Sequence, residues 1–153
     1  MSIIWKYLDK RSATIAAIKD YDAMQFIINS TDDEIKQTYE KMASIPSPQW
    51  DGMPRVHNPN ATEDRILSGI EEIDILKERY RQAVEYMEWF KPAWEQLSDE
   101  ERYCLETFYG DENTYGSNAA YYIAEFLKVE QATAYKRKNR ALDRLTVLLF
   151  GKS

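Results

Sequence analysis

An apolar stripe between Ile66 and Met87 limits the folds open to this chain more than any other feature of its sequence. Its members are Ile66, Ile70, Ile73, Leu76, Tyr80, Ala83 and Met87. Their separations of three and four residues average close to the 3.5 residues of a coiled-coil seam. A helix of about 30 residues extends roughly 45 Å and must bury such a stripe against a partner. The stripe therefore predicts either a helical hairpin or a helical dimer.

The nearest candidate partner lies in the first 43 residues. Apolar residues recur there mostly at helical spacing, at Leu8, Ile15, Ile18, Met24, Ile27 and Ile28. Thr31 and Glu34 have the spacing of a capping box, so either a second helix begins there or one helix continues to Met42. Pairing within the chain gives an antiparallel hairpin. Pairing between chains gives a homodimer through the same stripe.

Four prolines separate these two helical segments. They fall in residues 44–60 and are Pro46, Pro48, Pro54 and Pro59. Each lacks an amide donor and restricts the residue before it, so no regular helix passes through. The segment also holds His57, which we interpret as a surface residue. We expect a connecting loop, with a binding loop as the alternative.

The ends of the long helix follow from local signals. Asn60 and Glu63 form a second capping-box pattern, and Pro92 predicts an end at about Lys91. The acidic residues between them alternate with lysine and arginine, which is typical of a solvated face. We therefore expect a helical arm in residues 1–92, with helices over about 3–43 and 61–91.

The remaining residues, 93–153, are expected to form a separate domain of shorter helices. Ser98 and Glu101 give a third capping box, and Gly110 favours a helix end. Cys104 lies between them and is interpreted as buried packing. The whole chain is thus predicted to be all-α.

Residues 118–152 have the pattern of two helices around a tight turn. Ala124 is a small residue of the kind needed where two steeply crossing helices approach each other, and Ala134 supplies packing on the second helix. Ile123, Leu127 and Val129 supply apolar packing before and within the turn. This combination predicts a helix-turn-helix.

Charge is distributed unevenly along the chain. The total of −6 and a pI near 4.9 argue, taken alone, against nucleic-acid binding. Residues 1–92 carry a net charge of −4 and residues 93–127 a net charge of −7, whereas residues 128–153 carry +5. The second helix of the predicted motif is therefore the basic part of an acidic chain.

The second helix has an apolar back and a basic front. At 100° per residue, Ala141 and Leu145 lie within about 20° of Ala134, whereas Lys136 and Arg140 point away. The candidate DNA-binding residues are Gln131, Thr133, Lys136, Arg137, Lys138 and Arg140. Arginine can bind guanine with two hydrogen bonds and glutamine can bind adenine, while lysine suits phosphates.

Three runs of residues carry a resemblance to a known family. LSDEERYCLETFY, IAEFLKV and TAYKRKNRALDRL together resemble region 4 of the sigma-70 family, over about residues 94–151. The whole chain is similar to small phage and prophage sigma-like regulators of the ArpU type. Two positions depart from the pattern: Lys128 stands where the turn often has glycine, and Arg137 where an apolar residue often packs.

The resemblance implies a transcription regulator that binds double-stranded DNA in a sequence-specific way. It implies RNA polymerase as a further candidate partner, and it matches Gln131, Thr133, Lys136, Arg137 and Arg140 to the recognition helix. The chain has no room for the promoter-melting region of a complete sigma factor. The alternative is a helical oligomerising or packaging protein that resembles a terminase small subunit.

The sequence lacks the residues that an enzyme or a Cys/His metal-binding protein needs. One cysteine and one histidine cannot build a Cys/His metal site, and no nucleophile or phosphate-loop pattern is present. We therefore expect no catalytic residues, no metal and no cofactor. No apolar run approaches the roughly 18 residues that span a bilayer, and MSIIWKYLDK does not resemble a signal peptide. We expect a cytoplasmic protein.

Overall fold

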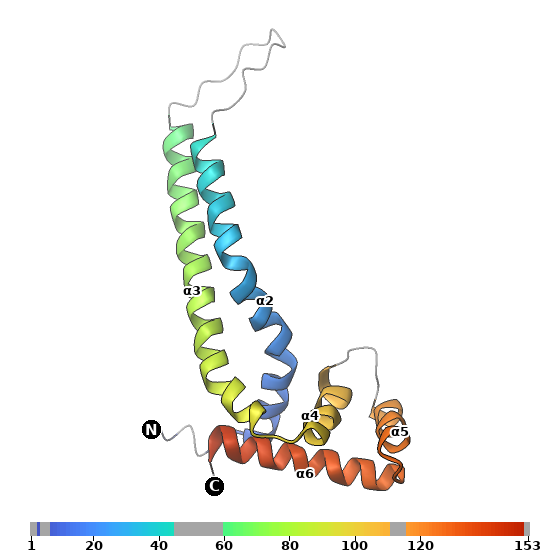
Figure 1. The fold of residues 1–153 in the computed structure, drawn as a ribbon. Coiled ribbons are helices and arrows are strands. Elements are labelled where there is room, and N and C mark those ends of the chain that lie inside the picture. The colour runs from blue at the N-terminus through green and yellow to red at the C-terminus, as the bar shows by residue number, and fades with distance from the viewer. Residues whose placement is uncertain (1–2, 4–6, 45–59, 111–115, 152–153) are drawn as a thin grey trace. The chain divides into compact units, whose positions relative to one another are not determined.

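The computed structural model describes residues 3, 7–44, 60–110 and 116–151, and all regular structure in these ranges is helical (Figure 1). The elements are α2 (Lys10–Ala43), α3 (Ala61–Glu95), α4 (Asp99–Leu105), the π-helical turn η1 (Glu106–Gly110), α5 (Gly116–Leu127) and α6 (Gln131–Phe150). The predicted all-α fold is confirmed. The proline-rich loop, with His57, lies outside the described residues apart from its two ends. No helix among those described could cross a membrane.

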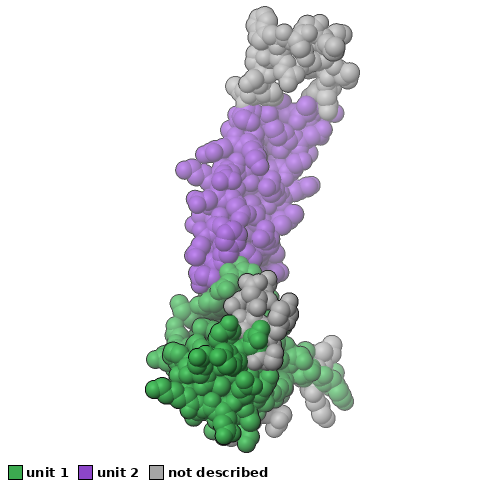
Figure 2. All heavy atoms as spheres, turned by 90° about the vertical axis from the view of Figure 1, so that its right-hand side faces the viewer, with its two compact units in different colours: residues 1–24, 86–153 green, residues 25–85 purple. Residues whose placement is uncertain are grey.

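The chain divides into two compact units (Figure 2). Unit 1 comprises residues 1–24 and 86–153, and unit 2 comprises residues 25–85. Both α2 and α3 therefore contribute to each unit. The expected domain boundary at residue 92 does not coincide with this division, because the start of α2 and the end of α3 pack in the core that contains α6.

The first long helix begins at Lys10, so the expected start near Ile3 is wrong. The Asp9 carboxylate accepts hydrogen bonds from the Ser12 backbone N–H at 3.1 Å and the Ser12 hydroxyl at 2.8 Å, which is the contact of an N-cap. These bonds lower the pKa of Asp9. The helix then continues without a break to Ala43. The Thr31 hydroxyl donates to the Ile27 carbonyl inside the helix and caps no new one.

The second long helix continues through Pro92 to Glu95, so the expected end at Lys91 is also wrong. Proline inside a helix removes one donor and costs about 3 kcal/mol. However, Phe90 and Ala93 on either side of it are 1% and 8% exposed and lie in the core of unit 1. The burial of these side chains offsets the cost of the proline.

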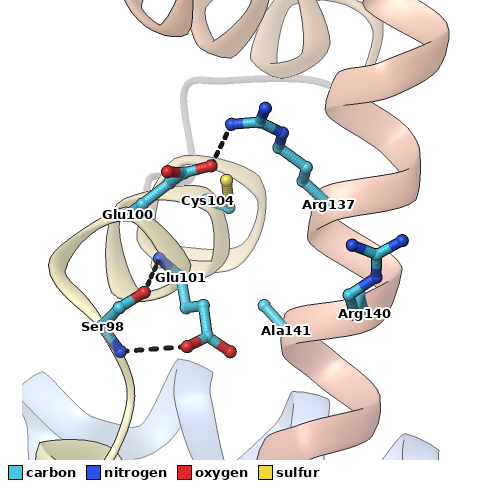
Figure 3. Close-up of a pocket in the computed structure, with 7 residues that line it drawn as sticks. All are labelled: Ser98, Glu100, Glu101, Cys104, Arg137, Arg140 and Ala141. Carbon is cyan, nitrogen blue, oxygen red and sulfur yellow. Dashed lines mark hydrogen bonds and ion pairs between the residues drawn. The ribbon is translucent and has the colours of Figure 1, made fainter.

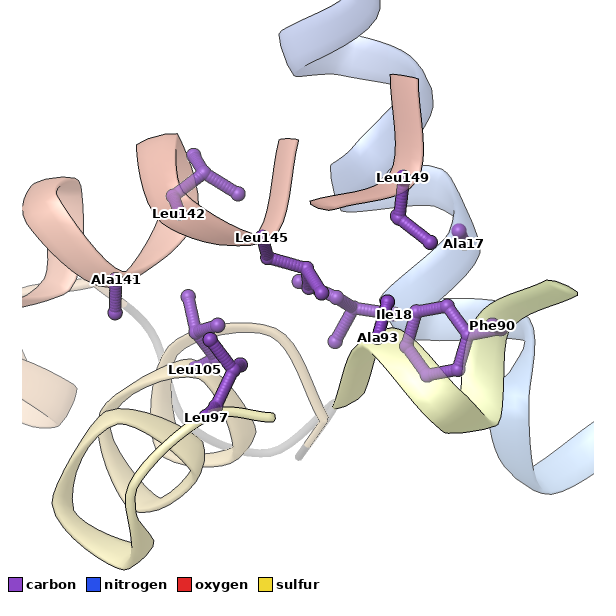
Figure 4. Packing of buried hydrophobic residues seen from close by; sticks show 10 residues of the cluster. All are labelled: Ala17, Ile18, Phe90, Ala93, Leu97, Leu105, Ala141, Leu142, Leu145 and Leu149. Carbon is purple, nitrogen blue, oxygen red and sulfur yellow. The ribbon is translucent and has the colours of Figure 1, made fainter. Parts of the chain in front are cut away.

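The core of unit 1 joins residues of four helices, α2, α3, α4 and α6 (Figure 4). Its members are Ala17, Ile18, Phe90, Ala93, Leu97, Leu105, Ala141, Leu142, Leu145 and Leu149. Phe90 is the largest of them, and its ring stacks on Tyr86 and Trp94 with centroid separations of 5.2 and 5.6 Å. Residues of α6 contribute four of the ten members, so α6 is held along one side by this core.

In unit 2, residues 25–43 of α2 and 61–85 of α3 lie side by side and antiparallel (Figure 1). Ile73, Leu76 and Ala83 of the predicted stripe are buried. Ile70 is 46% exposed, and the buried residue at this level of the seam is Gly69. Gly69 lies against the Met42 side chain so closely that a Cβ atom would overlap it. The absence of a side chain at Gly69 therefore lets the two helices approach.

We expect the effect of Gly69→Ala on the free energy of unfolding to depend on Met42. In the Met42→Ala background the change should stabilise the protein by about 1 kcal/mol, because alanine favours a helix over glycine. In the wild-type background the overlap with Met42 should remove or reverse this gain. Urea unfolding of the four proteins measures the coupling. An equal effect in both backgrounds would show that Gly69 and Met42 are not in contact.

Candidate nucleic-acid interface on α6

A three-residue turn, Lys128 to Glu130, connects α5 and α6. Lys128 has φ of 56°, in the left-handed region, and no other non-glycine residue in the described ranges has positive φ. The Val129 backbone N–H donates to the Ala124 carbonyl at 3.0 Å, which is the long bond of a Schellman helix end. Lys128, which stands where the sigma-like pattern often has glycine, therefore has the backbone conformation that favours glycine.

Small and apolar side chains form the contact between α5 and α6 on either side of this turn. Ile123 and Ala134 are fully buried, Ala124 is 9% exposed, and Cys104 of α4 joins the same cluster. The predicted packing of Ala124 and Ala134 is thus present. Burial raises the pKa of the Cys104 thiol to about 11, so the thiol stays neutral and acts as an apolar side chain.

The first turn of α4 places two carboxylates beside α6 (Figure 3). The Ser98 hydroxyl accepts from the Glu101 backbone N–H at 3.2 Å, and the Glu101 carboxylate accepts from the Ser98 N–H at 3.1 Å. The predicted capping box is confirmed. Burial raises the pKa of Glu101, but the bonds from Ser98 and the guanidinium of Arg144 outweigh it and lower the pKa overall.

Two arginines of α6 pair with these carboxylates. Arg137 donates to Glu100, and Arg144 donates to Glu101 and, at 3.2 Å, to the Gln96 carbonyl. The Arg137 side chain is 37% exposed, so its head group remains in reach of solvent. Arg137 therefore joins α6 to α4 and has an internal partner, unlike the outward cations of the same helix.

Lys138 also faces the body of unit 1. Its ammonium lies 5.0 Å from the centre of the Phe108 ring and 5.7 Å from that of Tyr109. Burial lowers the pKa of Lys138. The Lys138 ammonium therefore makes cation–π contacts with aromatic rings of its own chain. The geometry does not favour the phosphate contact expected for Lys138.

The remaining candidates differ in exposure. Gln131, Lys136 and Arg140 are exposed, as the angular count predicts for the two cations, and Thr133 is half-buried. Neither Lys136 nor Arg140 makes an ion pair with any residue that the structure describes. These two cations and Gln131 are on the first half of α6, ahead of its leucines.

Arg140 and Arg137 also line one side of a cleft of about 320 Å³ (Figure 3). The other side consists of Ser98, Glu100, Glu101 and Cys104 of the α4 region. Glu100 and Glu101 are paired with Arg137 and Arg144, so Arg140 is the charged group of this lining that has no ion pair with a described residue.

Comparison with known proteins finds no relative of this chain. No protein-family model, no curated protein and no solved structure matches the chain. The geometry and the sequence of α6 are therefore the features that indicate a function.

Sequence reasoning missed the groups that orient α6. Glu101 has a sequence signal only as part of a capping box, and Glu100 has none. Arg11 of α2, which donates to Asn139 at 2.8 Å and to Asp143 at 2.9 Å, gave no signal at all. The angular count did contain a hint, because Arg137 lies only about 60° from inward-facing Ala134 at 100° per residue.

We expect Lys128→Gly to stabilise the protein by about 0.5–1 kcal/mol, because glycine adopts the left-handed conformation without the clash of a Cβ atom. Lys128→Ala is the matched control, since it removes the same charge but keeps the Cβ atom and the strain. Urea unfolding measures both. Equal stabilities for the glycine and alanine variants would contradict the left-handed turn.

Proposed function

We propose that this chain is a transcription regulator that binds double-stranded DNA in a sequence-specific way, with α5 and α6 as its helix-turn-helix. One observation carries the proposal: the first half of α6 exposes Gln131, Lys136 and Arg140, while Ala134 and Ala141 of the same helix are buried. A recognition helix needs this combination, because its back must be fixed while its N-terminal side chains reach base edges in the major groove.

Each exposed residue suits a distinct contact. Arg140 presents a guanidinium that can take guanine through two hydrogen bonds, and Gln131 at the start of α6 can take adenine. Lys136 suits a phosphate. Thr133 lies between them and can contact either a base or the backbone. Arg137 is better placed to fix the position of α6 through Glu100 than to read a base.

The resemblance to sigma-70 region 4 supports the same proposal and suggests a more specific target and partner. On that ground we propose a promoter of phage or prophage genes as the target and RNA polymerase as a second partner. Residues 93–153 would form the DNA-binding domain, and residues 1–92 a helical arm. The protein would act in the cytoplasm.

A second candidate function is a helical oligomerising or packaging protein. The observation that favours it is the apolar surface of unit 2, where Leu67, Ile70 and Ile75 are 53%, 46% and 61% exposed. Light scattering on the isolated protein shows whether it oligomerises. A DNA-binding regulator can also form a homodimer through this surface, so only an oligomer that does not bind DNA would favour the second candidate.

The test of the proposed function is selection of bound fragments from random double-stranded DNA, followed by binding measurements on the selected sequence. Lys136→Ala/Arg140→Ala should weaken binding about 100-fold, because one phosphate and one base contact are lost. The slope of log affinity against log salt, about −0.9 per phosphate contact, should become shallower by about 1. Circular dichroism should show unchanged helicity, since both residues are exposed.

Lys36→Ala/Arg79→Ala is the matched control. It also removes one lysine and one arginine that are exposed on helices, but from unit 2. If α6 reads DNA, this control should bind the selected sequence as the wild type does. Equal weakening by both double variants, or a selection that yields no enriched sequence, would refute the proposal.

A further inference from the structure

Unit 1 contains a second cavity, of about 310 Å³, that the proposed DNA contact does not use. Its lining comes from three elements: Ile18, Tyr21 and Asp22 of α2, Phe90 and Trp94 of α3, and Glu106 of η1. Ile18 and Phe90 belong to the buried core and lie next to each other in Figure 4. The cavity therefore has a rigid apolar floor made by the best-packed part of the unit.

Three aromatic side chains in contact line this cavity, and the buried Phe90 ring supports the more exposed Tyr21 and Trp94. Phe90 is 1% exposed, and its ring centre lies 5.7 Å from that of Tyr21 and 5.6 Å from that of Trp94. Tyr21 and Trp94 are only half-buried, so part of each ring faces the open space. The face of an aromatic ring carries negative charge density and attracts a cation within about 6 Å.

Two carboxylates complete the lining. Asp22 and Glu106 are both exposed, and neither makes an ion pair with a residue in the described ranges. The carboxylates beside α6 differ in this respect, since Glu100 and Glu101 are paired with arginines. The cavity thus combines aromatic faces with two negative charges that are not neutralised within the described fold.

We propose that this cavity binds a lysine or arginine side chain of a partner protein, presented on a segment with apolar neighbours. The aromatic rings suit the long apolar stem of such a side chain, and the carboxylates suit its charged end. The same charges repel DNA. This surface is therefore a protein-binding site that adds to the DNA contact on α6, and it does not depend on that contact.

The test uses the full-length protein and two short probes, acetyl-Leu-Lys-amide and acetyl-Leu-Gln-amide. Binding is followed by the chemical shift of the Trp94 indole N–H in nitrogen-labelled protein. We expect the lysine probe to shift this signal and to bind about tenfold more tightly than the glutamine probe. Asp22→Asn/Glu106→Gln should remove that difference, and both substitutions keep the shape of the side chain at an exposed position.

Asp20→Asn is the matched control, because Asp20 is an exposed carboxylate of α2 that does not line the cavity. It should leave the affinity for the lysine probe unchanged. The proposal fails if neither probe shifts the Trp94 signal, or if both bind equally, which would indicate an apolar groove only. It also fails if Asp20→Asn weakens binding as much as the double variant does, since the attraction would then be nonspecific.

Discussion

Unit 1 depends on the hydrophobic core that Phe90 of α3 shares with the leucines of α6. Phe90 belongs to the end of α3, whereas Leu142, Leu145 and Leu149 lie more than 50 positions further along the chain. Burying each such side chain stabilises the fold by about 1.5–3 kcal/mol. The same core includes Ala17 and Ile18 of α2, so it joins residues near the N-terminus with α6 in one compact unit. It also allows α3 to continue through Pro92 despite the lost hydrogen bond.

The core also determines which part of α6 is available for function. The leucines fix the second half of the helix, and the first half is positioned by Ala134 and by the ion pair of Arg137 with Glu100. Because this pair is partly exposed, its contribution to stability is small, about 0–1 kcal/mol. Its main effect is to direct Arg137 toward α4. Lys136 and Arg140 are left as exposed cations on a helix whose back is fixed.

Features that depend on neighbouring residues were predictable from the sequence, and features that depend on distant residues were not. The Ser98 capping box and the buried alanines around the α5–α6 turn follow from short spacings. The position of Gly69 in the seam requires the Met42 side chain, and the continuation of α3 requires the core around Phe90. Among the candidate DNA-binding residues, exposure of Lys136 and Arg140 was predictable from the helical period. The contact of Lys138 with the Phe108 ring was not, because it joins two segments 30 positions apart.

If one core holds α6 and the end of α3 together, these two segments open only as a unit. Native-state hydrogen exchange measures this, because it gives a free energy of opening for each amide. The amides of residues 142–149 and of residues 87–93, except Pro92, which has no N–H, should share one free energy of exchange, equal to that of global unfolding. Exchange of the α6 amides through a separate opening of clearly lower free energy, with the α3 amides still protected, would contradict it.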